Sequence, residues 1–417
     1  MSLSRNQKIW EKQGEFILPT NEFIEPVLEK GIGSFVWDVD GKKYLDLNCG
    51  QFCLCFGHSY PPFIEAITRQ LENIAHTNTT TLTRVVFDAL QRLIEITDNT
   101  FKAGTLLSTG AEAVEFALRF SKSIRKKEGM VFLNQGYHGL SLGSQSVSTY
   151  GKWAFPKITE TFGVPVPKTL TEVDSCIDEI KRVLKENSGE IAAFIMEPIL
   201  GAGGMIFPPI HFFKEVRELC NKNKLILIFD ECQTGFGRTG SWFCYQKYEI
   251  APDVLIFAKA GGAGFPVSGV LFSKDLVEEM RRGNQTHFSS HQNDPLSAAA
   301  LLFVMEEIKE KNILARVENI GLTLLKKIIG IAQESQVLVN PRGIGLMIAF
   351  DLNENLFING KNPGSELIAR LLSRGIIIQC IDRGRTFRVL PNYLISMDEI
   401  DLFVENLRES IKEIGNG

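Results

Sequence analysis

The chain has 417 residues, which exceeds one ordinary domain, so we expect a large domain and a smaller one. A hydrophobic fraction of 44% is typical of a globular protein, and a formal net charge of −4 provides no basic field for nucleic acid or an anionic membrane. No apolar run approaches the roughly 20 residues that cross a bilayer, and the polar N-terminus lacks a signal-peptide core, so we expect a cytoplasmic protein without nucleic-acid or membrane partners.

The first predicted element is a hairpin at residues 33–48, where two alternating strands flank an Asp40-Gly41 turn. Between about residues 100 and 300, apolar runs alternate with helical patterns, which is typical of a mostly parallel α/β sheet. The predicted strands are residues 129–134, 191–197, 225–230, 254–257 and 267–273. The predicted helices are residues 112–127, 211–223 and 296–309, each with an apolar stripe at helical spacing.

The last hundred residues change character and predict a small α+β domain. The predicted strands there are residues 344–352, 376–380 and 386–390, and the predicted helices are residues 365–373 and 398–414. The predicted division is an N-terminal segment that contributes to the small domain, a large domain and a C-terminal small domain, at residues 1–60, 61–312 and 313–417.

Eight cysteines in a long chain without a signal peptide favour reduced thiols over a disulfide framework. Three of them, at positions 49, 53 and 55, lie close to His58. A zinc site would use these residue types, but no second cluster with matching spacing follows. Small apolar packing residues in a turn are the favoured alternative.

Two motifs at the ends of predicted strands suggest ligand binding. Residues 106–113 read LLSTGAEA, a strand that passes through small residues into a helix, whose N-terminus offers N–H groups to a phosphate. A simple helix cap has the same pattern. Residues 225–240 read LILIFDECQTGFGRTG, a buried strand that ends in two acids. A buried acid requires a cationic partner, which a protonated pyridine ring would supply; an acid that caps the next element is the alternative.

Two further residues complete the pattern. Lys259 follows an apolar strand and precedes a glycine run, and burial would leave its amine free to form an imine, although many strand-end lysines are solvated. Tyr137, between glycines in GYHG at 136–139, could lie flat against a planar cofactor or pack in the core. A phosphate cradle, an acid, a lysine and an aromatic plate at strand ends are what pyridoxal-phosphate (PLP) chemistry requires.

These motifs resemble the class III aminotransferases of PLP fold type I over nearly the whole chain, most specifically at residues 230–240 and 259–266. The resemblance implies that Lys259 carries the cofactor as a Schiff base, that Asp230 keeps its ring nitrogen protonated, and that Tyr137 stacks on the ring. The other implied cofactor contacts are Thr109, Gly110 and Ala111 for the phosphate, Gln233 for the phenolic oxygen, His138, Glu197, and Ser290 for the phosphate of a neighbouring subunit. A homodimer or a dimer of dimers follows from Ser290.

Departures from the family's pattern concern the substrate. Ornithine-type members carry a glutamate where this chain has Ala202, and acetylornithine-type members carry an arginine where it has Leu140. Arg388 remains as the carboxylate clamp, a bidentate role that suits arginine. The resemblance implies ping-pong transfer of an amino group between an amino acid or amine and a 2-oxo acid, and the clamp without its glutamate suggests a site for a simple α-carboxylate.

The pattern also resembles the 2,2-dialkylglycine decarboxylases, in CGQ at 49–51, EPIL at 197–200 and NDPL at 293–296. That resemblance implies that Gln51 contacts the scissile carboxylate, whereas Tyr137 departs from the tryptophan of that group. It also implies an alkali cation at Asp294 and Thr79, with a helix cap as the alternative for Asp294. A racemase with the same cofactor residues, and a thiol or metal module without PLP, stay open as alternatives.

Overall fold

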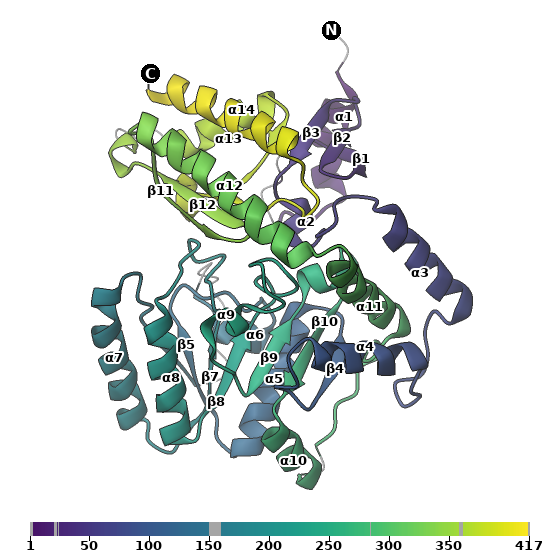
Figure 1. Cartoon of the computed structure of the whole chain (residues 1–417), viewed down its shortest axis with the longest axis vertical. Coiled ribbons are helices and arrows are strands. Elements are labelled where there is room, and N and C mark those ends of the chain that lie inside the picture. The colour runs from purple at the N-terminus through teal and green to yellow at the C-terminus, as the bar shows by residue number, and fades with distance from the viewer. Residues whose placement is uncertain are drawn as a thin grey trace. The chain divides into compact units, whose positions relative to one another are not determined.

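The computed structural model describes residues 3–20, 23, 25–149, 160–283, 285–357 and 362–415 (Figure 1). The chain forms two compact units. The smaller comprises Met1–Pro61, Thr323–Gly343 and Ile348–Gly417, and the larger comprises Pro62–Leu322 and Ile344–Met347. Among the described helices, none is long and apolar enough to cross a membrane.

The larger unit is built on a seven-stranded sheet in the order β4-β10-β9-β8-β7-β5-β6. β10 runs antiparallel to β4 and β9, and the remaining pairs in the sheet are parallel. The strands are β4 (Ala103–Leu107), β5 (Gly129–Leu133), β6 (Thr161–Val164), β7 (Ile191–Met196), β8 (Ile226–Asp230), β9 (Val254–Phe257) and β10 (Ser268–Phe272). Every residue of β5, β7, β8, β9 and β10 is buried, as expected when helices cover both faces.

Helix α5 (Gly110–Arg125) packs against β7, β9 and β10. Its Ala113, Phe116, Ala117 and Phe120 recur at helical spacing and are buried in the core, where each phenylalanine contributes roughly 1.5–3 kcal/mol. Helices α7 and α8 lie side by side in Figure 1. The other helices of this unit are α3 (Pro61–Asn73), α4 (Arg84–Glu95), α6 (Leu142–Ser146), α7 (Val173–Glu186), α8 (Ile210–Asn223), α9 (Cys244–Tyr248), η3 (Lys259–Gly262), α10 (Lys274–Arg282) and α11 (Pro295–Glu310).

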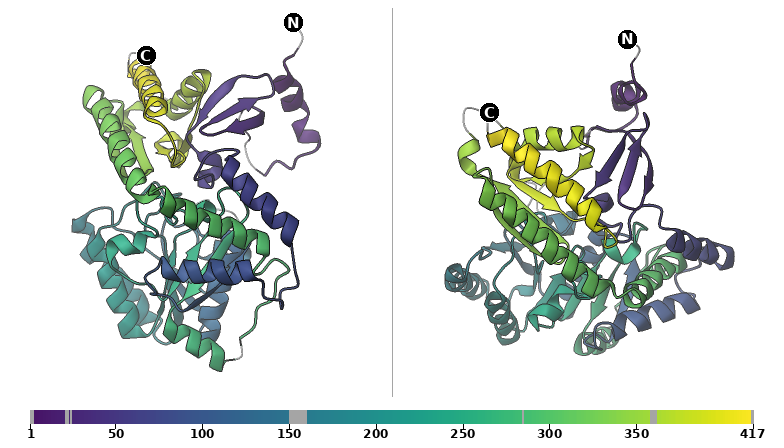
Figure 2. Two further views of the ribbon diagram at one scale, coloured as in Figure 1. Left: turned by 45° about the vertical axis from the view of Figure 1, so that its right-hand side comes forward. Right: turned by 45° about the horizontal axis from the view of Figure 1, so that its top comes forward.

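The smaller unit contains two four-stranded sheets. One has the order β1 (Leu28–Ile32), β2 (Phe35–Asp38), β3 (Lys43–Asp46) and β13 (Ile376–Ile377), and the other has β11 (Leu338–Ile344), β12 (Met347–Leu352), β15 (Thr386–Val389) and β14 (Gln379–Ile381). Helices α13 (Pro363–Ser373) and α14 (Met397–Gly415), yellow-green and yellow in Figure 2, pack together. Helices α1 (Arg5–Lys12) and α2 (Cys49–Phe52) also belong here, and α12 (Ile313–Glu334) has residues in both units.

The α/β fold class and the five predicted strands of the central region are confirmed, with ends that differ by one residue at most. The single strand predicted at 344–352 is wrong, because a turn at Gly345 separates β11 from β12. Gly345 has φ of 52°, and a Cβ there would lie 2.6 Å from the carbonyl oxygen of Arg238, so a strand conformation does not fit. The strand predicted at 376–380 is divided between two sheets, as β13 and β14.

Candidate functional site

Five strands of the larger unit, β4, β5, β7, β8 and β9, run in the same direction. Residues that follow their C-terminal ends therefore lie along one edge of the sheet, where open α/β sheets bind ligands. β10 runs the other way and begins at this edge, where the Ser268 hydroxyl donates to the Thr109 carbonyl at 2.7 Å. The predicted residues that this topology brings to the edge are Thr109, Gly110, Ala111, Tyr137, His138, Glu197, Asp230, Gln233 and Lys259.

Asp230, the last residue of β8, is buried and paired with a histidine. Its Oδ2 lies 2.8 Å from Nδ1 of His138, and its Oδ1 accepts a hydrogen bond from the Cys232 amide at 3.0 Å. Burial raises the pKa of Asp230, but the hydrogen bond and charge of His138 outweigh it and hold the pKa below its ordinary value. The carboxylate is therefore ionised at neutral pH. This pair joins residues 92 positions apart, so no local pattern in the sequence predicts it.

Glu197, directly after β7, is a second buried acid at this edge. It accepts hydrogen bonds from the backbone amides of Tyr137, at 2.8 Å, and Gly201, at 3.2 Å. Burial raises the pKa of Glu197 to about 7, because the low-dielectric surroundings disfavour the charged form. Burial, with Glu197 and Asp230 nearby, also raises the pKa of the half-buried Tyr137, so its hydroxyl stays neutral.

Two buried polar atoms at this edge have no hydrogen-bond partner among the described residues, Nε2 of His138 and Nε2 of Gln233. Buried polar atoms are normally paired, so both fit a polar group bound here. Gly201 makes room for the Gln233 side chain, since a Cβ at Gly201 would lie 2.0 Å from Oε1 of Gln233. A planar ligand with polar substituents is consistent with these atoms.

The residues that the sequence predicts for phosphate binding lie at the N-terminus of α5. Thr109 caps the helix by accepting a hydrogen bond from the Glu112 amide at 3.2 Å, and the backbone N–H groups of Gly110 and Ala111 follow in the first turn. A Cβ at Gly110 would lie 3.1 Å from Sγ of Cys232. The small residues therefore keep the backbone open at this turn, as the sequence predicted.

Lys259 lies just beyond β9, as the sequence predicted, and begins the short helix η3. Its φ is 46°, in the left-handed region that side chains other than glycine rarely adopt. Such strained residues persist only when the surroundings hold them, and they cluster at functional sites. Close packing nearby is shown by Gly261, where a Cβ would lie 2.7 Å from the Phe236 ring.

Gln51 and Arg388, the predicted substrate contacts, belong to the smaller unit. Gln51 lies within α2 in a run of four residues with positive φ, from Cys49 to Phe52. Arg388 on β15 is buried, donates a hydrogen bond to Gln379, and holds its guanidinium carbon 4.7 Å from the centroid of the Phe52 ring. Arg388 is thus oriented by Gln379 and Phe52.

The cysteine cluster next to this run has no complete metal-ligand set. Nε2 of His58 lies 2.9 Å from Oδ2 of Asp46, which also accepts a hydrogen bond from the Gly50 amide. Cys49 and Cys55 are buried. Within the described residues, the group with metal-ligating side chains in reach of one another lies elsewhere, at His76, His291 and Asp294.

The predicted cation ligands lie in the larger unit, close to the turn that carries Ser290. The Thr79 hydroxyl donates to the Ser289 carbonyl at 3.0 Å. Asp294 caps α11, with Oδ1 accepting from the Leu296 amide at 3.0 Å, while Oδ2 contacts the two histidines that the sequence analysis missed. Only the three-residue spacing of His291 and Asp294 was visible in sequence, since His76 is 218 residues away from Asp294.

Comparison with known proteins agrees with this geometry. Residues 19–411 match the family model for aminotransferase class-III. The chain is 31% identical to an acetylornithine aminotransferase of Methanosarcina acetivorans, over 98% of this chain and 97% of that protein. A crystal structure of a transaminase from the marine bacterium Virgibacillus superposes with a TM-score of 0.92 at 25% identity, over 98% of this chain and 99% of that one. An amine transaminase from an uncultivated Pseudomonas species, in a PLP-bound form, superposes with a TM-score of 0.88 at 25% identity, over 96% and 99%. The chain therefore belongs to the class III aminotransferases, transferases of PLP fold type I whose cofactor is PLP.

Proposed function

We propose that this aminotransferase takes its amino group from a donor with a simple α-carboxylate and passes it to a 2-oxo acid. One observation carries the cofactor part of this proposal: the hydrogen-bonded Asp230–His138 pair, the unpartnered amide nitrogen of Gln233 and the strained Lys259 follow parallel strands of one sheet. An anion, a free donor and an amine are the groups that a pyridine ring nitrogen, a phenolic oxygen and a carbonyl require.

We assign each residue one role toward PLP. Lys259 would hold the cofactor through Nζ, Asp230 would accept a hydrogen bond from its protonated ring nitrogen, and Tyr137 would cover its ring. Gln233 and His138 would meet its polar substituents, Glu197 would fix Tyr137 through the backbone amide, and Ser290 would reach the phosphate of a neighbouring subunit. Thr109, Gly110 and Ala111 would bind the phosphate through the α5 N-terminus.

When bound, PLP supplies an electron sink for the negative charge that develops at the donor's Cα. Asp230 sustains that sink, because its lowered pKa keeps the carboxylate ionised against the ring nitrogen. Once the donor's amine has displaced it from the cofactor, Lys259 would act as the general base, with Nζ taking the proton from the donor's Cα. The second half of a ping-pong cycle repeats these proton movements in reverse with the 2-oxo acid.

The donor class rests on Arg388 together with two departures from the patterns of relatives. Arg388 is buried and oriented by Gln379 and Phe52, which suits a fixed bidentate clamp for a carboxylate. Ala202 stands where ornithine-type members have a glutamate, and Leu140 stands where acetylornithine-type members have an arginine. A long ω-amine donor is therefore disfavoured, although the chain is similar to an acetylornithine aminotransferase.

The test is a set of single-turnover reactions of the PLP-loaded enzyme with L-alanine, 2-aminoisobutyrate and N-acetylornithine. Bleaching of the visible cofactor band and release of carbon dioxide are followed together. We expect L-alanine to bleach the band without carbon dioxide. Preference for N-acetylornithine would overturn the donor assignment. Because 2-aminoisobutyrate has no α-proton, bleaching with carbon dioxide would instead establish the decarboxylating reaction in which Gln51 contacts the scissile carboxylate. Exchange of the α-proton with solvent without bleaching would establish a racemase.

Three finer predictions accompany this function. Phe288 and Leu82, each 72% exposed beside the segments of Ser289 and Thr79, support the predicted homodimer or dimer of dimers, which light scattering would measure. The cytoplasmic location stays a prediction. An alkali cation at Thr79 and Asp294 also stays a prediction, and it would have to replace the hydrogen bonds that both side chains already make.

A further inference from the structure

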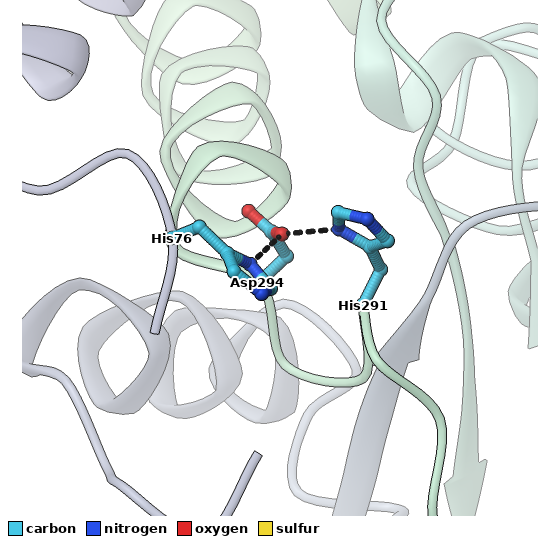
Figure 3. A group of neighbouring side chains, drawn as sticks. All are labelled: His76, His291 and Asp294. Carbon is cyan, nitrogen blue, oxygen red and sulfur yellow. Dashed lines mark hydrogen bonds and ion pairs between the residues drawn. The ribbon is translucent and has the colours of Figure 1, made fainter. Parts of the chain in front are cut away.

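Three metal-ligating side chains from two distant segments converge on one point, as Figure 3 shows. Nδ1 of His76 lies 2.9 Å, and Nδ1 of His291 lies 2.7 Å, from the same oxygen of Asp294. The two imidazole centroids are 4.8 Å apart. All three ligand atoms lie within 4.8 Å of one another, so one ion could reach all of them after small side-chain rotations.

The residue types select the class of ion. Two imidazoles and one carboxylate match the three-protein-ligand zinc sites, whereas alkali and alkaline-earth cations prefer oxygen ligands. Metal–ligand distances of about 2.0–2.1 Å in a tetrahedral site separate the ligand atoms by about 3.4 Å. Each histidine would therefore move away from Asp294 by roughly 0.5–0.7 Å, well within the freedom of half-exposed side chains.

The burial of the group also suits a metal centre with open positions. Asp294 is only 6% exposed and is held by the α11 N-terminus, so it offers a fixed anionic ligand. In the single chain, the side chains of His76 and His291 are 48% and 63% exposed, which leaves coordination positions open on that side.

We infer that His76, His291 and Asp294 form a binding site for a divalent transition metal of the zinc type. The site does not depend on the proposed donor. It shares Asp294 with the predicted alkali site but differs from it in its ligands, because both histidines take part and the Thr79 hydroxyl does not.

The position of the site indicates what the metal does. The turn that bears His291 is attached to the strand and helix that form the phosphate cradle: Ser289 donates to Glu112 at 3.0 Å, and the Asn293 amide donates to the Leu106 carbonyl at 3.0 Å. His76 comes from a separate segment between α3 and α4. A metal would therefore link that segment to the turn and stabilise the surroundings of the cradle without entering it.

The experiment is calorimetric titration of zinc chloride into the PLP-loaded enzyme after treatment with a chelator, with metal analysis of the dialysed product. We expect one zinc per chain. Thermal unfolding should shift upward by roughly 2 °C with excess zinc, because the ion binds the folded form. Cobalt(II) in place of zinc should give visible absorption bands of nitrogen and oxygen coordination, a readout that does not involve activity.

Variants separate this site from adventitious binding. His76→Ala and His291→Ala change half-exposed side chains and should each weaken zinc binding by more than the roughly 10–100-fold that loss of an outer-shell partner costs. Asp294→Asn keeps a good helix cap and should weaken it similarly. The matched control is His211→Ala, an exposed histidine 3.8 Å from Glu215 on α8, and it should leave binding unchanged.

Equal zinc affinity in the wild type and in His76→Ala or His291→Ala would overturn the inference. So would a potassium- or sodium-dependent shift that Asp294→Asn abolishes and the histidine variants keep, because that pattern belongs to the predicted alkali site. Loss of binding in both histidine variants with retention in His211→Ala would support it.

Discussion

Asp230 and Glu231 are consecutive and both are buried, yet their pKa values shift from the ordinary values in opposite directions. Burial raises the pKa of both, but His138 brings the pKa of Asp230 below its ordinary value, whereas Glu231 rises to about 7. The Glu231 carboxylate instead accepts hydrogen bonds from neutral donors, the backbone amides of Cys244 and Tyr245 and the Thr234 hydroxyl. Equal burial is thus compatible with a lowered pKa for one acid and a raised pKa for its neighbour, and the hydrogen-bonding partners decide which.

The largest expected effect comes from removing the charge on the cofactor side. Asp230→Asn preserves the shape of the side chain but loses the anion, so we expect kcat/KM for the best donor to fall roughly 10²–10⁴-fold at saturating PLP. The measurement is steady-state transamination with matched folded protein. Glu231→Gln is the control, and its turnover per folded molecule should stay near wild type. An equal fall in kcat/KM in both variants would contradict the assignment of the catalytic charge to Asp230 alone.

The second effect is on stability and depends on pH. Glu231→Gln places an amide among groups that require acceptors, and we expect the free energy of unfolding to fall by about 1–3 kcal/mol at pH 5. The pKa of Glu231 rises from 4.5 unfolded to about 7 folded, so the folded protein binds the proton more tightly. The tighter proton binding of Glu231 in the folded protein stabilises it by about 3 kcal/mol below pH 4.5. This stabilisation is lost as pH rises to about 7.

The difference between wild type and Glu231→Gln should therefore shrink between pH 5 and pH 8. Denaturant unfolding at both pH values measures it. A difference that grows with pH would mean that Glu231 is ionised at neutral pH and that its three donors outweigh burial, as His138 does for Asp230.

The smallest expected effect is on PLP affinity, and it comes from filling the space that Gly201 leaves for the Gln233 side chain. In Gly201→Ala the new Cβ would lie 2.0 Å from Oε1 of Gln233, so that side chain must leave its place. We expect PLP to be retained roughly tenfold less tightly, the order of one lost hydrogen bond, with little change in stability. Fluorescence titration of the cofactor-free protein with PLP measures this. Gly330→Ala, where nothing lies within 4 Å of a new Cβ, is the control. Unchanged PLP affinity in Gly201→Ala would show that Gln233 does not contact the cofactor.

Much of the fold was predictable because local patterns and sheet geometry agree. The strand at Val254–Phe257 was predicted with its exact bounds, since a short apolar run before a glycine-rich loop has few alternatives. Failures occurred where long-range packing decides: the turn at Gly345 is required by the Arg238 backbone, and β6 lies at the sheet edge with a short, weakly apolar sequence.

The sequence by itself determined which residues follow the ends of parallel strands, and therefore which side chains, Lys259 and Asp230 among them, gather at one edge. Only the tertiary structure decided their chemical state and their partners. His138 lies 92 residues from Asp230, and His76 lies 218 residues from Asp294. Local patterns report the preferences of one segment, whereas ionisation and metal ligation depend on groups that meet only when distant segments pack together.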